Sequence, residues 1–132
     1  MKKIAVICLS LFFALAVRNG NTQTAVNLEV VEMEICTAIQ DRMPAGVDTE
    51  FLKTVEQLYC YTKISGGSEQ SKIWHVWYYN NQEMARVELS VKAEMWRTWS
   101  SKKIVEEWIG DWRVDVINET GDVLKSKAFK IK

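Results

Sequence analysis

The stretch Met84-Ala85-Arg86-Val87-Glu88-Leu89-Ser90-Val91-Lys92 alternates apolar and polar side chains from one end to the other. Successive side chains of a β-strand point to opposite faces, so a period of two predicts a strand with one buried and one exposed face. The same alternation recurs in Val31–Ile35 and in Trp112–Ile117. These three segments favour an all-β fold.

Two further runs are apolar on both parities. Leu58–Ile64 and Ile73–Tyr79 are rich in aromatic and β-branched residues, which suits strands that are packed on both faces. Phe129 and Ile131 end a last strand. Turn-forming residues separate the runs, and they occur at Ser65–Ser68, Asn80–Asn81 and Asn118–Asp122.

Short connections between strands predict antiparallel pairing, and about seven such strands predict an immunoglobulin-like antiparallel β-sandwich. One segment departs from the β pattern. Asp48–Leu58 would place Phe51, Val55 and Leu58 on one face of a helix, although it could equally be an irregular crossover. The sequence leaves both interpretations open.

The N-terminus has the pattern of a secretory signal peptide. Lys2 and Lys3 precede an apolar run from Ile4 to Val17, and a polar stretch follows it. A helix of that run would measure about 21 Å, which is short of the roughly 30 Å hydrocarbon core of a bilayer. We therefore expect residues 1–25 to be a cleaved signal peptide and residues 26–132 to form a single domain that is periplasmic or secreted.

Charge narrows the classes of partner. Removal of residues 1–25 leaves 14 basic and 17 acidic side chains, a formal net charge of −3. Capture of nucleic acid or of an anionic membrane surface needs clustered basic residues in excess, so neither is expected. Membrane attachment is expected only if the N-terminal segment is not cleaved.

Two cysteines, Cys36 and Cys60, remain after cleavage. An oxidising compartment favours a disulfide between them. Strand parity argues against it, because Cys60 shares the parity of Leu58 whereas Cys36 shares that of Glu34. These two residues and the single His75 are too few for a typical zinc site, and no metal or cofactor is predicted.

Several motifs of a known family follow one another along residues 27–131. In chain order they are Asp41-Arg42-Met43-Pro44, Tyr59-Cys60-Tyr61-Thr62, Trp74-His75-Val76-Trp77-Tyr78-Tyr79, Met95-Trp96-Arg97-Thr98-Trp99-Ser100-Ser101-Lys102, and Trp108-Ile109-Gly110-Asp111-Trp112-Arg113-Val114-Asp115-Val116 followed by Gly121. In this order they resemble the bacterial family called domain of unknown function 2914. The resemblance implies a small β-rich extracytoplasmic module and brings no established activity, substrate or catalytic residue.

All six tryptophans lie between Trp74 and Trp112, which is more than one small core usually buries, so some should reach the surface. Aromatic rings stack on saccharides or cations, and arginine forms paired hydrogen bonds to carboxylate or phosphate. The alternative is that these rings are core and that the serines only satisfy a turn. The candidate binding residues are Trp96, Arg97, Trp99, Ser100, Ser101 and Lys102, together with His75 and Trp77.

His75 is interpreted first as a structural histidine within an aromatic cluster. A hydrolytic arrangement of His75, Ser100 and Asp111 is a remote alternative, because no nucleophile turn of the Gly-x-Ser-x-Gly type is present. We therefore expect no enzymatic activity.

Two binding functions remain. The first is interaction with a periplasmic or cell-envelope protein, through edge strands or aromatic anchors. The second is binding of glycan or cell wall through Trp96, Trp99, Arg97 and Lys102. The first is preferred, because sugar sites also use planar amides and carboxylates, which the Trp96–Lys102 segment does not supply.

Overall fold

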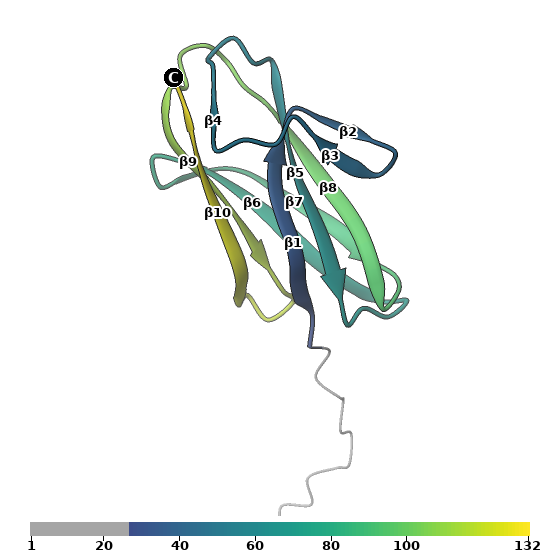
Figure 1. Cartoon of the computed structure of the whole chain (residues 1–132). Helices are drawn as coiled ribbons and strands as arrows, with labels where there is room; N and C mark the ends of the chain where they lie inside the picture. The colour runs from purple at the N-terminus through teal and green to yellow at the C-terminus, as the bar shows by residue number, and fades with distance from the viewer. Residues whose placement is uncertain (1–26) are drawn as a thin grey trace, which may run out of the picture.

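The computed structural model describes residues 27–132, which fold into ten strands and no helix (Figure 1). The strands are β1 (Glu29–Cys36), β2 (Ala38–Gln40), β3 (Met43–Ala45), β4 (Glu50–Phe51), β5 (Gln57–Ser65), β6 (Ser71–Tyr79), β7 (Gln82–Val91), β8 (Met95–Lys103), β9 (Gly110–Ile117) and β10 (Val123–Ile131). The all-β prediction is confirmed. The predicted signal peptide lies outside the described residues, and within residues 27–132 no helix is long and apolar enough to cross a membrane.

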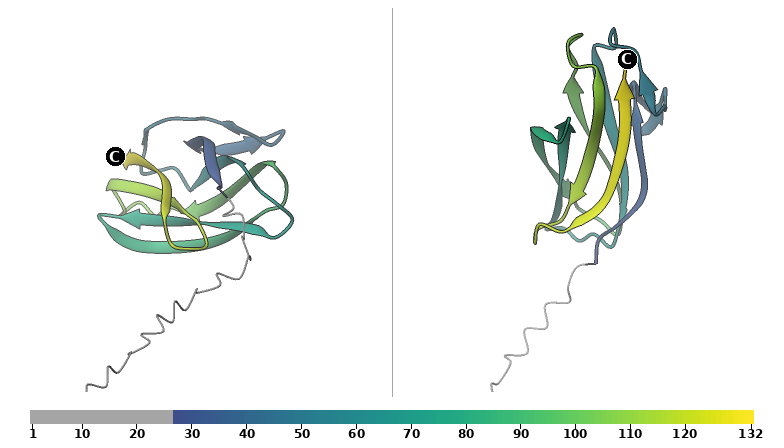
Figure 2. Two further views of the ribbon diagram at one scale, coloured as in Figure 1. Left: turned by 90° about the horizontal axis from the view of Figure 1, so that it is seen from below. Right: turned by 90° about the vertical axis from the view of Figure 1, so that its left-hand side faces the viewer.

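The long strands form a two-layer sandwich. Strands β1-β5-β8 make one sheet and β4-β10-β9-β6-β7 the other, and Figure 2 shows them stacked face to face. Strands β2 and β3 form a small separate ribbon. The first, second and fifth long strands share one sheet and the remaining four share the other, which is an immunoglobulin-like distribution. The seven long strands account for the predicted number.

The core lies between the two sheets and is filled by alternate residues of the long strands. Trp77 of β6 is fully buried and its ring meets the edge of Phe129 at 6.2 Å between centroids. Phe51 of β4 packs edge-on against the same Phe129 ring at 6.0 Å. Edge-to-face aromatic pairs add to the apolar area that they bury. Short β4 is therefore held to the sandwich by its phenylalanine.

One detail of the strand pattern differs from expectation. Val31 was predicted to share the buried face with Met33 and Ile35, but it is 44% exposed. The pairing of β1 with β5 shifts register between Val30 and Glu32, so Val31 falls at an irregularity. A bulge of this kind inserts an unpaired residue and interrupts the alternation of faces.

The helical interpretation of Asp48–Leu58 is wrong. The segment is the irregular crossover, and it carries the two-residue strand β4. The backbone of Phe51 pairs with Ile131 of β10 in a parallel register. The Asp48 carboxylate accepts hydrogen bonds from the backbone N–H groups of Thr49 and Glu50, as an N-cap would, but no helix follows.

Cys36 and Cys60 are both free thiols, so the candidate disulfide is not formed. Cys60 is directly opposite Ile35 on neighbouring strands, which places Cys36 on the other face of the same sheet. The parity objection therefore prevails over the compartment rule. Burial raises the pKa of both thiols, which keeps them protonated and poorly nucleophilic.

Candidate functional site

The candidate binding residues do not form one surface, because β8 is a terminal strand of its sheet and points alternate side chains inward and outward. Ser100 points into the core, where His75 and Trp77 are fully buried. Arg97 and Trp99 share the opposite face of β8. The single predicted surface is thus divided between the core and the exterior.

The inward group forms a continuous chain of hydrogen bonds between the two sheets. Trp77 Nε1 donates to Ser100 Oγ at 3.0 Å, and Ser100 Oγ lies 2.7 Å from His75 Nδ1. His75 Nε2 lies 3.1 Å from Thr62 Oγ1, which donates to the Thr98 carbonyl at 2.9 Å. We call these five groups the buried hydrogen-bond chain.

The partners at its two ends assign the protons. The Thr98 carbonyl can only accept, so Thr62 uses its proton there and must accept from His75 Nε2. His75 Nδ1 is then an acceptor, and the Ser100 hydroxyl donates its hydrogen bond to it. Burial lowers the pKa of His75 to about 3, so the ring is neutral, as this tautomer requires.

Only part of the hydrolytic arrangement of His75, Ser100 and Asp111 is present. His75 and Ser100 do come together, but Ser100 is 4% exposed and His75 is not exposed at all. Asp111 is exposed at the start of β9, where it faces Lys130 at 4.0 Å. A substrate could reach the serine only if the sandwich opened, so the pair is part of the core.

The outward group contributes to a shallow groove where the edges of the two sheets meet. The groove has a volume of about 410 Å³, and β7 and β8, the terminal strands that contact each other there, supply most of its lining. Its lining residues are Arg42, Ser90, Lys92, Trp96, Arg97, Thr98 and Trp99. We call it the basic groove, since its charged residues are all cationic.

Arg42 enters this groove from a distant part of the sequence. It lies in the two-residue turn between β2 and β3, where Gln40 pairs with Met43 and both Asp41 and Arg42 have positive φ. The left-handed conformation is unfavourable for an arginine, and strained residues of this kind cluster at binding sites. Arg42 was not among the predicted binding residues. The only sign of it in the sequence was its place in the Asp41-Arg42-Met43-Pro44 motif.

Arg97 carries an unused donor. Its Nε and the Tyr61 hydroxyl are the buried side-chain polar atoms in residues 27–132 that have no hydrogen-bond partner. Burial, and then the charge of Glu32, raises the pKa of Tyr61, whereas nearby Arg97 opposes the rise. The unpartnered Nε is thus buried near Tyr61, and Arg97 also contributes to the lining of the basic groove.

The other predicted residues have local roles. Trp96 packs partly against the core. The ammonium of Lys102 lies 4.7 Å from the centre of the Trp108 ring, and burial lowers its pKa. Ser101 is exposed, and neither Ser101 nor Lys102 lines the basic groove.

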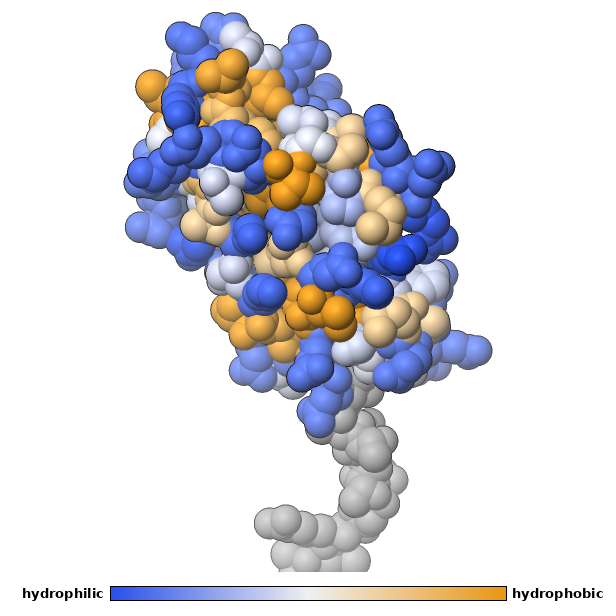
Figure 3. All heavy atoms as spheres, viewed as in Figure 1, coloured by the Kyte–Doolittle hydropathy of each residue, from blue (hydrophilic) through white to orange (hydrophobic). Residues whose placement is uncertain are grey.

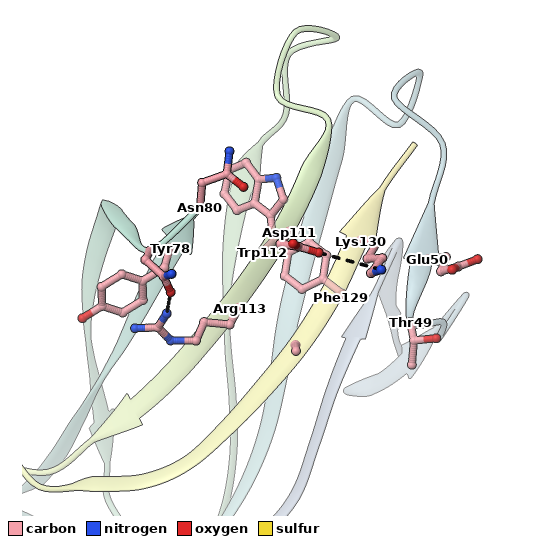
Figure 4. Close-up of a pocket in the computed structure, with 11 residues that line it drawn as sticks. Thr49, Glu50, Tyr78, Asn80, Asp111, Trp112, Arg113, Phe129 and Lys130 are labelled. Carbon is pink, nitrogen blue, oxygen red and sulfur yellow. Dashed lines mark hydrogen bonds and ion pairs between the residues drawn. The ribbon is translucent and has the colours of Figure 1, made fainter.

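A second, larger hollow lies on the outer face of the five-stranded sheet. It has a volume of about 600 Å³, and Figure 4 shows Tyr78, Asn80 and Arg113 on one side of it and Thr49, Glu50 and Lys130 on the other. Asp111 and Ala128 lie between them on β9 and β10. We call it the polar cavity.

Register explains why these residues meet. Lys130 lies opposite Glu50 on one side and opposite Asp111 on the other, so three strands bring their charges into one row. The backbone N–H of Asn80 donates to the Asp111 carbonyl at 2.9 Å and extends the row. Because the members come from four separate segments, only the Asn80–Asn81 turn could have been suspected from the sequence.

No group of three or more histidine, cysteine, aspartate or glutamate side chains in residues 27–132 is placed to hold a metal ion.

No curated protein matches the chain. The family model described as "Protein of unknown function (DUF2914)" matches residues 70–131, which contain β6 to β10 and most of the lining of both hollows. Through residues 70–131 the resemblance to the DUF2914 family is confirmed.

Proposed function

We propose that this chain is an exported, non-catalytic protein-interaction module, and that an acidic segment of a periplasmic or cell-envelope protein docks in the basic groove. The observation that carries the proposal is the lining itself. Arg42, Lys92 and Arg97 converge there with two tryptophan rings and no carboxylate. Uncompensated positive charge beside aromatic faces suits a partner that presents carboxylates.

The composition around the groove supports a protein partner. Tryptophan, arginine and methionine are enriched in the cores of protein interfaces. Met43 and Met95 are 42% and 51% exposed and are adjacent in sequence to Arg42 and Trp96. Figure 3 shows apolar side chains in separate groups on one face of the molecule, so recognition through one large apolar patch is not favoured there.

Other functions have less support. The Ser100–His75 pair is buried and lacks the acid, which favours a non-catalytic role. The acidic excess of residues 26–132 disfavours nucleic acid. For glycan binding at this surface, the groove lining lacks amides and carboxylates, and Lys102 is engaged with Trp108.

The test measures binding of a fluorescently labelled hexaglutamate peptide to residues 26–132 by fluorescence anisotropy. We expect saturable binding that weakens with salt, and an approximately tenfold loss of affinity in Arg97→Gln, because a charge-assisted hydrogen bond is removed. Arg42→Gln, a change in an exposed turn, should weaken binding in the same direction without affecting the core.

Lys125→Gln is the matched control, since it removes one positive charge from an exposed position of β10, outside the groove lining. The proposal fails if hexaglutamine binds as well as hexaglutamate, or if Lys125→Gln weakens binding as much as the two arginine variants. Tighter binding of a single-stranded oligonucleotide than of hexaglutamate would also overturn it.

A further inference from the structure

We infer that the polar cavity is a second binding site, separate from the basic groove, and that it takes a short saccharide. Its lining contains what the Trp96–Lys102 segment lacks: the amides of Asn80 and Asn81 and the carboxylates of Asp111 and Glu50. Groups of these types donate to and accept from sugar hydroxyls. The inference does not depend on the function proposed for the groove.

The hollow arises from a contrast in side-chain size. Ala128 lies opposite Arg113 on β9, and Lys130 follows it on the same face of β10. A methyl group between two long side chains leaves a depression in the outer surface of the sheet. Ala128 itself is exposed, so the depression is open to solvent. The volume falls within the usual range for small-molecule sites.

The charges of the cavity balance one another. Arg113 and Lys130 supply two positive charges, whereas Asp111 and Glu50 supply two negative charges. Asp111 and Lys130 face each other at 4.0 Å, and both are largely exposed, so their donors and acceptors remain available to a ligand. A neutral ligand with many hydroxyls matches this lining better than an anion or a cation does.

The polar groups are held in place before any ligand arrives. The Arg113 guanidinium stacks over the Tyr78 ring at 4.0 Å, donates from Nε to Asp115 at 3.3 Å, and donates from Nη1 to the Asn81 amide oxygen at 2.5 Å. Asn81 in turn belongs to a two-residue hairpin turn with Asn80, and both have positive φ, as a type I′ turn requires. Preorganised groups lose less entropy on binding.

The two sites occupy different parts of the fold. The polar cavity is built from the segment around β4 and from β6, β9 and β10, and the basic groove from β7, β8 and the β2–β3 turn. They share no lining residue. A ligand of one site therefore need not displace a ligand of the other.

The test is titration of the isotope-labelled domain with three neutral tetrasaccharides, the tetramer of N-acetylglucosamine, cellotetraose and maltotetraose, followed by backbone amide NMR. With at least one of them at about 10 mM, which exceeds a millimolar dissociation constant, we expect shifts at Asn80, Asp111 and Lys130. Shifts at Arg97 and Trp99 should stay small. If none of the three sugars shifts the cavity amides, the inference is wrong.

Two variants locate the site. Ala128→Trp fills the hollow from an exposed position and should weaken binding at least about tenfold, while Asp111→Asn keeps the shape, removes one acceptor charge and should weaken it less. Glu88→Gln is the control, an exposed carboxylate on β7 outside the cavity. Equal loss in Glu88→Gln and Asp111→Asn would overturn the assignment, whatever the behaviour of Ala128→Trp. Asp111→Asn should bind hexaglutamate as the unmodified domain does, because Asp111 does not line the basic groove. A failure of the saccharide site can therefore be told apart from a failure of the groove proposal.

Discussion

Two segments that are both rich in tryptophan differ in how far this fold buries them. Ile73–Tyr79 on β6 has a neighbour on each side, β7 and β9, and buries Val76 and Trp77 although they point to opposite faces. Trp96–Lys102 on β8 ends its sheet. It buries Ser100 and leaves Arg97 and Trp99 partly exposed.

The comparison shows that position in the sheet, more than composition, decides whether an aromatic residue is core or surface. A central strand is covered by the side chains of two neighbours as well as by the facing sheet. A terminal strand lacks one neighbour, so its outward side chains stay accessible. The following predictions test this distinction, from the largest expected effect to the smallest.

Trp77→Ala should lower the free energy of unfolding by about 3–5 kcal/mol, because it empties a fully buried site in the aromatic core. Trp99→Ala, the same change on β8, should cost about 1 kcal/mol or less, since the site is partly exposed. Urea unfolding of both variants measures the difference. Equal losses would show that β8 is as fully packed as β6 and would break the comparison.

Ser100→Ala should cost about 2 kcal/mol, because it leaves both Trp77 Nε1 and His75 Nδ1 without partners inside the core. Its neighbour provides a matched control. Ser101→Ala makes the identical chemical change on the exposed face of β8 and should be nearly neutral. Urea unfolding of the pair would contradict the buried hydrogen-bond chain if Ser100→Ala were also neutral.

Buried His75 makes the stability of the fold depend on pH. His75 has a pKa of about 3 in the folded state against the ordinary value of 6.5, so between these values the unfolded state binds more protons. The contribution of His75 to the free energy of unfolding is therefore complete above pH 6.5. It is lost as the pH falls below that value, at about 1 kcal/mol per pH unit.

His75→Phe removes the titrating ring and should flatten this dependence between pH 6.5 and pH 5.5, although the variant is less stable overall. Thermal or urea unfolding at both pH values measures the slope, and carboxylates contribute little in this window. An unchanged slope in the variant would assign the pH dependence to other groups and not to His75.

The sequence predicted the strands well where one face is buried. Val87, Leu89 and Val91 alternate as expected on β7. Val114 and Val116 are buried on β9 as expected, but Asp115 between them is buried too, where it accepts hydrogen bonds from Arg113 and Ser126. The sequence failed at Val31, because a bulge depends on the register of two strands, and it did not decide between a helix and a crossover at Asp48–Leu58. There the spacing of Phe51, Val55 and Leu58 imitates a helix although Phe51 pairs with Ile131.

The sites were predicted less completely. Trp96, Arg97 and Trp99 do contribute to one groove, because neighbours along a strand remain neighbours in space. Arg42 and Lys92 join them only through the turn of a remote ribbon and the meeting of two sheet edges. The polar cavity depends on the register of four segments, which no local pattern contains.

The buried hydrogen-bond chain has a consequence for how the two layers find each other. Aromatic cores tolerate many packings, since apolar contacts have no direction. Here β6 must meet β5 and β8 in one alignment, because sliding either sheet by two residues, about 7 Å, would break the hydrogen bonds that His75 and Trp77 make to Thr62 and Ser100 in the other sheet. The buried hydrogen-bond chain thus fixes the register of one sheet against the other. It favours one sandwich among many that would bury similar apolar area.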